Sequence, residues 1–195
     1  MKYNIPNNQS EILPNKLGLK NQKEIELSEF EGFLEAEILL TERLSSRTKF
    51  DIKYILKIHK LALNHLYSFA GKYRDVNMSK AGFLFASARF LPEIMKTLEE
   101  EILLNLPNNY VKKEDLIKDI AIIHGELLFI HPFREGNGRT TRILANLMAR
   151  KHGYESLKFE KIGREKFDQY VSAVQSCAKK DYKEMIELIR FIFPD

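Results

Sequence analysis

One stretch of twelve residues, HPFREGNGRTTR (His131–Arg142), decides how this chain can fold. Residues 116–130 before it form an apolar-rich run with helical spacing, and residues 140–152 after it again place apolar side chains three and four positions apart. The stretch is therefore predicted to be a loop between two helices. Gly136 and Gly138 fit such a loop, because glycine adopts backbone conformations closed to other residues and lets a ligand approach the main chain.

The side chains of this loop suit an anion. The second predicted helix begins on the loop, so its first amide groups and its positive dipole end would face a bound anion. Arg139 and Arg142 lie three residues apart on one helical face, where their guanidinium groups can bind neighbouring phosphate oxygens. Glu135 suits a Mg²⁺ ion that bridges those phosphates. His131 is the one loop residue that titrates near neutrality, which favours a general base.

Each fixed position of the signature HxFx(D/E)GNGRxxR is met in this stretch. The stretch therefore resembles the Fic family of nucleotidyltransferases, within the Fic/Doc superfamily. The resemblance implies an all-α, Fic-type helical bundle that transfers AMP from ATP to a serine, threonine or tyrosine hydroxyl of a target protein and releases pyrophosphate. ATP and Mg²⁺ are the co-substrate and the metal ion that the resemblance implies.

The resemblance also assigns roles within the loop. His131 is expected to deprotonate the target hydroxyl, Phe133 to anchor the loop in the core, and Glu135 to hold Mg²⁺. Arg142 is expected to hold the γ-phosphate. The residues expected to bind the rest of the triphosphate, through side chains or loop amides, are Gly136, Asn137, Gly138 and Arg139.

A second segment departs from the helical pattern. Between Gly71 and Phe85, apolar and polar residues alternate on either side of a turn-like stretch at 79–82, which predicts a short β-hairpin. The sequence FAGKYRDVNMSKAGFLF resembles the part of Fic proteins that ends in a hairpin flap over the active site. The resemblance implies that the strand edge of the flap pairs with the backbone of the target. Lys80 in the turn is a candidate ATP-binding residue, and a solvent-facing turn lysine is the alternative.

The remainder of the chain predicts helices. Residues 1–20 contain two prolines and few apolar side chains, which indicates an extended arm, and residues 21–195 are expected to form a single domain. Apolar spacing, capping residues and prolines place the other helices at about 22–44, 52–70, 92–106, 167–174 and 185–192. The apolar positions that predict the first of these, with a polar back, are Ile25, Phe30, Phe33, Leu34, Ile38 and Leu39.

Four further titratable side chains are interpreted as structural. His59 and His65 lie on faces of the helix that Asp51 is expected to cap. His124 lies about two turns before the loop histidine, so packing beneath the loop is favoured over a second catalytic role. Tyr170 either lines the adenine site or packs in the core, and packing is favoured.

Composition narrows the classes of function. The net charge is only +4, and lysines and arginines are scattered among acidic residues, so nucleic acid is not an expected partner. No segment has the length and apolarity of a membrane span, and the start of the chain does not read as a signal peptide. We therefore expect a cytoplasmic protein without a membrane partner, with export by another route left open. Cys177 is the single cysteine, which excludes an internal disulfide.

The loop does not fit two other nucleotide-binding motifs. GNGRTT lacks the third glycine and the preceding strand of a dinucleotide-binding fingerprint, and no Gly-Lys-Ser/Thr supplies a phosphate-binding loop. Within the resemblance, kinases of the Doc branch carry a larger residue in place of the second glycine, so Gly138 favours AMP transfer. A Doc-like kinase, a transferase with another nucleotide donor and a catalytically silent Fic-like binding module stay open.

The expected partners are a target protein docked on the flap edge and a small antitoxin-like inhibitor. Many Fic proteins restrain themselves through a helix with the motif (S/T)xxxE(G/N). Residues 28–32, SEFEG, fall one residue short of it, which rotates the Glu31 carboxylate by about 100° relative to Ser28 on a helix. Inhibition is therefore expected from a separate antitoxin-like protein or from self-association.

Overall fold

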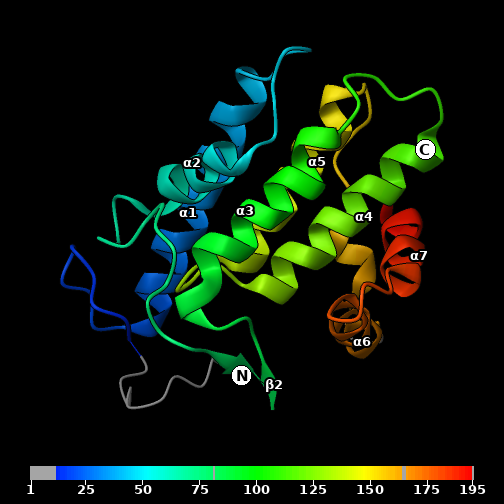
Figure 1. Ribbon diagram of the computed structural model, residues 1–195. Coiled ribbons are helices and arrows are strands. Elements are labelled where there is room, and N and C mark those ends of the chain that lie inside the picture. Colours follow the sequence, from blue (N-terminus) through cyan, green and yellow to red (C-terminus); the bar gives the residue numbers. More distant parts are fainter. Residues whose placement is uncertain (1–11, 81, 164–165, 195) are drawn as a thin grey trace.

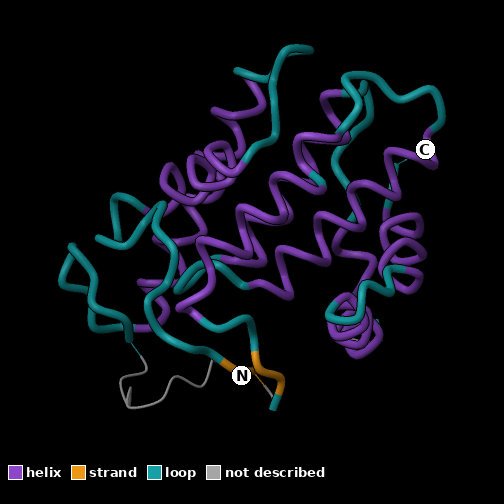
Figure 2. Tube along the Cα trace, viewed as in Figure 1, coloured by secondary structure: helices purple, strands orange, loops and turns teal. Residues whose placement is uncertain are grey.

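The computed structural model describes residues 12–80, 82–163 and 166–194. Helices dominate the described residues, and a two-stranded hairpin is the only sheet among them (Figures 1 and 2). The elements in chain order are α1 (Gln22–Glu42), α2 (Ile52–Leu63), β1 (Ser79–Lys80), β2 (Phe83–Leu84), α3 (Leu91–Glu101), α4 (Lys113–Ile130), α5 (Asn137–Lys151), α6 (Phe167–Cys177) and α7 (Lys183–Ile192), with 3₁₀ turns at Ala88–Phe90, Leu103–Asn105 and Phe159–Ile162. The prediction of an all-α bundle with a short hairpin is confirmed.

Helices α4 and α5 form the centre of the bundle. Helix α5 packs against α1, α2 and α4, whereas α4 also packs against α6 and α7 on its other side (Figure 1). Each of the two central helices buries apolar side chains around most of its circumference, which is the pattern of a core helix rather than a surface helix. The loop that joins them is therefore fixed at both ends by the core.

Helix α2 begins as predicted and ends early. The Asp51 side chain accepts a hydrogen bond from the Tyr54 amide at 2.8 Å, which confirms the N-cap. The helix stops at Leu63 instead of continuing to Ala70, and residues 64–70 form turns. His59 then accepts a bond from the Gly71 amide at 2.8 Å, so the chain folds back onto the helix it has left.

Helix α1 is apolar on two faces, and periodicity alone did not indicate which face is buried. The buried face carries Ile25, Glu29, Phe33, Ala36 and Leu40. The predicted apolar positions Phe30, Leu34 and Ile38 lie on the exposed face instead, where their exposed fractions are 60%, 49% and 52%. The buried face includes a carboxylate because a tyrosine and an arginine of the site meet it there.

The hairpin and the amino-terminal segment complete the fold. Strands β1 and β2 pair antiparallel, with Ser79 opposite Leu84 and Lys80 opposite Phe83. Residues 12–20 form no helix or strand, and the Lys16 amide donates to the Leu66 carbonyl at 2.8 Å. Residues 1–11 of the predicted arm lie outside the described residues, so the division into arm and domain stays a prediction. Among the described helices, none combines the length and the apolar composition that crossing a membrane requires.

Candidate active site

The loop between α4 and α5 turns sharply at both of its ends. His131 caps α4 in the left-handed conformation, with φ of 54°, and its amide donates to the Leu127 carbonyl at 2.9 Å. Gly136 caps the start of α5 with φ of 76°. A Cβ atom at Gly136 would lie 2.7 Å from the Phe33 ring, so both the backbone conformation and the packing require glycine.

The Asn137 side chain holds the loop closed. Its Oδ1 accepts from the Phe133 amide at 2.8 Å, and its Nδ2 donates to the Phe133 carbonyl at 2.7 Å. The Phe133 ring is buried and stacks on the His59 ring at 3.9 Å, which agrees with the predicted anchoring role. Both polar atoms of the Asn137 side chain are bonded within the loop, so the predicted phosphate contact of Asn137 would be made by its backbone N–H.

His59 supports the loop from below. Burial lowers its pKa to about 4, so the imidazole is neutral. Its Nδ1 accepts from the Gly71 amide, which places the proton on Nε2, and Nε2 lies 3.0 Å from the Glu135 carbonyl as a donor. The structural role predicted for His59 therefore matches its contacts. His65 likewise bonds only to Ser28 among the described residues.

His131 is buried and neutral. Burial lowers its pKa to about 3, the Leu128 carbonyl opposes the shift, and Arg74 and Lys80 add to it through their charges. Its Nδ1 lies 3.1 Å from the Leu128 carbonyl, which can only accept, so Nδ1 carries the proton and Nε2 carries the lone pair. The Phe85 ring, just after β2, stacks on the imidazole at 3.8 Å. The hairpin therefore covers the histidine, as the resemblance implied.

Arg74 connects the base of the hairpin to the end of α4, a function that the sequence analysis missed. The residue is buried, and burial lowers its pKa to about 10. Its guanidinium donates to the carbonyls of His131 at 2.8 Å and Val76 at 2.6 Å, and also to those of Ala86 and Ile130. A cation at the carboxyl end of a helix is favoured by the helix dipole. Arg74 thereby fixes the position of the hairpin over His131.

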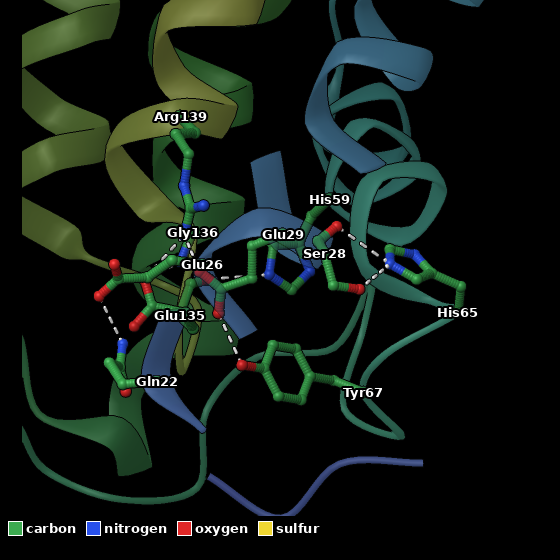
Figure 3. Close-up of polar contacts among 10 residues, drawn as sticks. All are labelled: Gln22, Glu26, Ser28, Glu29, His59, His65, Tyr67, Glu135, Gly136 and Arg139. Atoms are coloured by element: carbon green, nitrogen blue, oxygen red, sulfur yellow. Dashed lines mark hydrogen bonds and ion pairs between the residues drawn. The ribbon is translucent and has the colours of Figure 1, made fainter. Parts of the chain in front are cut away.

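One side of the loop faces α1 and is charged. Arg139 of α5 donates to Glu29 at 2.6 Å and to Glu135 at 3.3 Å, and Figure 3 shows its guanidinium between these two carboxylates. The Tyr67 hydroxyl donates to the other oxygen of Glu29 at 2.6 Å. The Arg139 guanidinium also lies 4.6 Å above the Phe33 ring. A triphosphate contact of Arg139 stays a prediction, and it requires competition with Glu29.

Glu135 is the one carboxylate within the loop itself. Burial and the neighbouring Glu29 raise its pKa, while the Gly136 amide, which donates at 2.7 Å, and Arg139 act in the opposite direction. A partly desolvated carboxylate of this kind favours a cation beside it. No group of three or more metal-binding side chains occurs among the described residues. Mg²⁺ usually takes one or two carboxylates together with phosphate oxygens and water, and Glu135 stays the predicted ligand for it.

The opposite side of the loop faces α6 and is aromatic. Arg142 is exposed, and its guanidinium lies 5.4 Å from the Phe159 ring centroid. Tyr170 of α6 is buried, its hydroxyl lies 2.6 Å from His124 Nε2, and the nearby charge of Arg142 opposes the rise of the tyrosine pKa that burial causes. Tyr170 therefore packs in the core as favoured, and a role at an adenine site stays untested.

The structure brings the predicted residues of the loop and of α5 together, and it adds Lys80 from β1, whose charge is close enough to lower the pKa of His131. Within the part of the chain that the structure describes, a Cβ atom built on Gly138 meets nothing within 4 Å, so the space beside this residue of α5 is open. The catalytic and binding roles of these residues remain predictions.

Two buried charged residues of the site escaped the sequence analysis. Glu29 could have been found, because it lies four residues before Phe33 and four after Ile25 on the apolar face of α1. A carboxylate in that position needs a buried partner. No comparable pattern surrounds Arg74, whose hydrogen bonds all go to carbonyl groups brought near by the tertiary fold.

Comparison with known proteins places these features in a family. The sequence model of the Fic/DOC family matches residues 49–149. Protein adenylyltransferase VbhT of Bartonella schoenbuchensis is 34% identical over 148 residues, which cover 73% of this chain and 30% of that protein. Protein adenylyltransferase Fic of Nematostella vectensis is 26% identical over 93% of this chain and 40% of its own length. The chain thus spans 30% to 40% of the length of these curated relatives.

Solved Fic domains share the fold. The Fic domain of the Bep8 protein from Bartonella sp. 1-1C has a TM-score of 0.78 at 22% identity, over 95% of this chain and 92% of that chain. The BepC protein from Bartonella tribocorum, which has bound AMPPNP, has a TM-score of 0.76 at 19% identity, over 96% and 95% of the two chains. A Fic domain from Bartonella quintana with bound ADP has a TM-score of 0.77 at 23% identity, over 96% and 93%.

The family model covers more than half of the 195 residues, and a relative above 30% identity aligns with more than two thirds of them. The segment that the family model matches contains both the hairpin and the complete loop from His131 to Arg142. This chain belongs to the Fic/DOC family.

Proposed function

We propose that this protein transfers AMP from ATP to a serine, threonine or tyrosine hydroxyl of a target protein and releases pyrophosphate. The observation that carries the proposal is the open space at Gly138, the second residue of α5, where a side chain would project away from the protein at the start of the helix. Phosphates can approach the backbone there, because no atom of the described residues lies within 4 Å of a Cβ built on this glycine. The relatives named protein adenylyltransferases and the Fic domains with bound AMPPNP and ADP support the assignment.

His131 would act as the general base. In the neutral imidazole the lone pair is on Nε2, because Nδ1 donates its proton to the Leu128 carbonyl, and this bond fixes the ring. A base with a pKa near 3 is weak, but this value belongs to a site in which the positive charges of Arg74 and Lys80 help to lower the pKa. The negative charge of a nucleotide would offset that charge and raise the pKa toward the working range.

The first turn of α5 would bind the phosphates. Its N-cap, Gly136, offers no side-chain acceptor for the first amide groups, so these N–H groups and the helix dipole can stabilise negative charge. Arg142 is exposed and can present its guanidinium to a terminal phosphate. Glu135 would hold Mg²⁺, and that ion would neutralise charge on the phosphate oxygens.

The target protein would dock on the hairpin. The sheet contains only β1 and β2 among the described residues, so a backbone segment of the target can add a strand at an edge. Leu84 is 74% exposed at the hairpin, where it can pack against the target. The hairpin projects at one end of the bundle, beside the loop that carries His131 (Figure 1).

The exposed face of α1 suits the antitoxin-like inhibitor. Four large apolar side chains form a stripe there: Leu27, Phe30, Leu34 and Ile38. Exposed glutamates that have no ion pair among the described residues border the stripe: Glu24, Glu31, Glu35 and Glu42. A basic amphipathic helix of a partner would complement both the apolar side chains and the charges. Its binding would be transmitted through Glu29, on the opposite face of α1, to Arg139.

A Doc-like kinase is the alternative enzyme. Incubation of the protein with candidate targets and ATP labelled at either the α- or the γ-phosphate separates the possibilities. Protein-bound α-label means AMP transfer, γ-label means phosphorylation, and label from neither phosphate means a silent or inhibited protein. Gly138→Leu would place a side chain in the open space, and we expect it to lower α-label transfer.

The inhibitor proposal has a separate test. The probe is a synthetic amphipathic helix with a leucine face and a lysine face, and binding is measured by calorimetry at low and high salt. We expect salt-sensitive binding that Leu34→Lys abolishes and Leu104→Lys, at an exposed leucine outside α1, preserves. Equal binding of both variants would overturn the docking surface. A dimer of the protein alone that Leu34→Lys dissociates would indicate self-association instead.

A further inference from the structure

The further inference concerns the orientation of the Arg142 guanidinium before a phosphate binds. An exposed arginine samples many rotamers, and an arginine that binds a phosphate gains affinity when its planar group is already oriented. Two side chains limit it in this structure. The Phe159 ring centroid lies 5.4 Å from its guanidinium, and the Tyr170 hydroxyl is near enough for the charge of Arg142 to oppose the rise of the tyrosine pKa.

Tyr170 is itself held by a buried histidine. Its hydroxyl lies 2.6 Å from Nε2 of His124, and both residues are almost fully excluded from solvent. The His124 ring stacks on the Phe159 ring with centroids 5.4 Å apart. Side chains from α4, α6 and the 3₁₀ turn at Phe159–Ile162 thus meet around the guanidinium of a fourth element, α5.

The donors and acceptors of this group fix the direction of each bond. Arginine can only donate, so toward Arg142 the Tyr170 oxygen can serve only as an acceptor. The single proton of the hydroxyl then goes to His124 Nε2, which requires the neutral histidine to carry its own proton on Nδ1. Burial keeps the pKa of His124 near 3, so this neutral form persists across the physiological range. The opposite tautomer would leave the hydroxyl proton without an acceptor among the described residues.

We propose that Tyr170, oriented by His124, is a positioning residue that holds the Arg142 guanidinium ready for a phosphate of the nucleotide. The inference rests on the proposed function, because Arg142 is the residue assigned there to a terminal phosphate. It goes beyond that function in naming two residues outside the signature loop as determinants of nucleotide affinity. Neither residue contacts the reacting atoms, so neither is a catalytic residue.

The test removes one hydroxyl group and measures nucleotide binding. In Tyr170→Phe the ring and its packing remain, but Arg142 loses its acceptor and His124 loses its donor. We expect the dissociation constant for ATP and the KM for ATP to rise about tenfold, with kcat within about twofold of the wild type. The ADP affinity is expected to change less, because ADP lacks the phosphate assigned to Arg142.

The matched control is Tyr110→Phe. Its hydroxyl donates to Asp119 at 2.8 Å in a part-buried hydrogen bond, and this contact lies outside the loop and its neighbours. We expect the control to bind ATP like the wild type. An equal loss of ATP affinity in both variants would overturn the proposal, because it would reflect a general loss of packing. Unchanged ATP affinity in Tyr170→Phe would overturn it as well.

A double variant separates positioning from packing. If Tyr170 acts through Arg142, Tyr170→Phe should have no further effect on ATP affinity in an Arg142→Ala background. A full additive loss would overturn the proposal. ATP binding is measured without turnover, so a wild type that binds ATP but transfers no AMP refutes the proposed function while this test still decides the role of Tyr170. A wild type that binds no ATP refutes both.

His124 is tested by its acceptor nitrogen. His124→Phe keeps a ring against Phe159 and removes the acceptor, so its ATP affinity should fall as in Tyr170→Phe, and the double variant should be no weaker than either single variant. His124→Gln keeps an acceptor and should bind ATP more tightly than His124→Phe. ATP binding by His124→Phe at the wild-type level would remove His124 from the positioning role.

Discussion

The two arginines that follow the loop have opposite surroundings. Arg139 lies toward α1 between the carboxylates of Glu29 and Glu135, whereas Arg142 lies toward α6 beside a neutral hydroxyl and an aromatic ring. They are three residues apart on one helix, and this spacing alone does not distinguish their surroundings. The difference is made by the helices on either side of α5.

This asymmetry divides the two positive charges between different tasks. The charge of Arg139 is compensated within the protein, so this arginine ties the loop to α1 before any ligand arrives. The charge of Arg142 has no carboxylate partner among the described residues, so it can be offered in full to an anion. A bound nucleotide would thus interact first with Arg142 and would reach Arg139 only by competing with Glu29.

The largest effect is expected from His131→Ala, because both arginines would serve a reaction that this histidine drives. Transfer should fall by about 10² to 10⁴-fold, the usual contribution of a general base, while ATP binding survives. This result would show that nucleotide binding depends on the arginines and proton transfer on the histidine. Labelled-AMP transfer and ATP calorimetry on the same variant measure the two quantities. An equal loss in both would mean that His131 shapes the nucleotide site.

Arg142→Ala should separate the arginines most directly. We expect ATP affinity to fall by about 10 to 100-fold, the range for loss of a charge-assisted bond, and the preference for ATP over ADP to disappear. Arg139→Ala should affect ATP affinity less and thermal stability more, because it leaves the buried Glu29 without its cation. Titration of both nucleotides against both variants provides the measurement. The reverse order of the two affinities would contradict the asymmetry.

Glu29→Gln should release Arg139. The buried ion pair is lost while the size of the side chain is kept, so the free energy of unfolding should fall by about 1 to 3 kcal/mol. ATP affinity should rise at the same time, because Arg139 no longer has to leave a carboxylate at 2.6 Å. Denaturant unfolding and calorimetry measure the two changes.

Tyr67→Phe is the matched control for this release. It removes the hydrogen bond to Glu29 but leaves the ion pair with Arg139 in place. A smaller loss of stability, about 1 kcal/mol, with unchanged ATP affinity is expected. If Glu29→Gln leaves ATP affinity unchanged as well, Arg139 takes no part in nucleotide binding.

The sequence was sufficient to predict the loop but not the different surroundings of the two arginines. The loop could be predicted because all of its functional residues are local, and its neighbouring helices have clear apolar spacing. What lies beside each arginine depends on tertiary contacts across long sequence separations, such as Glu29 with Arg139. The face of α1 that becomes buried could not be chosen either, because Ile25 and Phe33 on one face compete with Phe30 and Leu34 on the other.

The last comparison concerns protonation, and it compares the two sides of α5 through their buried histidines. His59 lies under the loop with a pKa lowered to about 4, and His124 lies on the α6 side with a pKa lowered to about 3, in both cases chiefly by burial. The unfolded chain binds these protons near pH 6.5, so it holds more protons than the folded protein between pH 6.5 and the lowered values. The stability from the neutral histidines is complete above pH 6.5 and is lost as the pH falls through that window.

Denaturant unfolding from pH 7.5 to pH 4.5 measures this loss, at about 1.4 kcal/mol per pH unit for each excluded proton at most. His131, with a pKa near 3, adds a third proton. In His124→Phe, the change in the free energy of unfolding per pH unit should decrease by the contribution of one proton, whatever the stability at neutral pH. His59→Phe should give the same decrease. A slope unchanged in His124→Phe would mean that this histidine is charged in the folded protein. Tyr170 could not then donate to it, and the neutral surroundings of Arg142 would no longer hold.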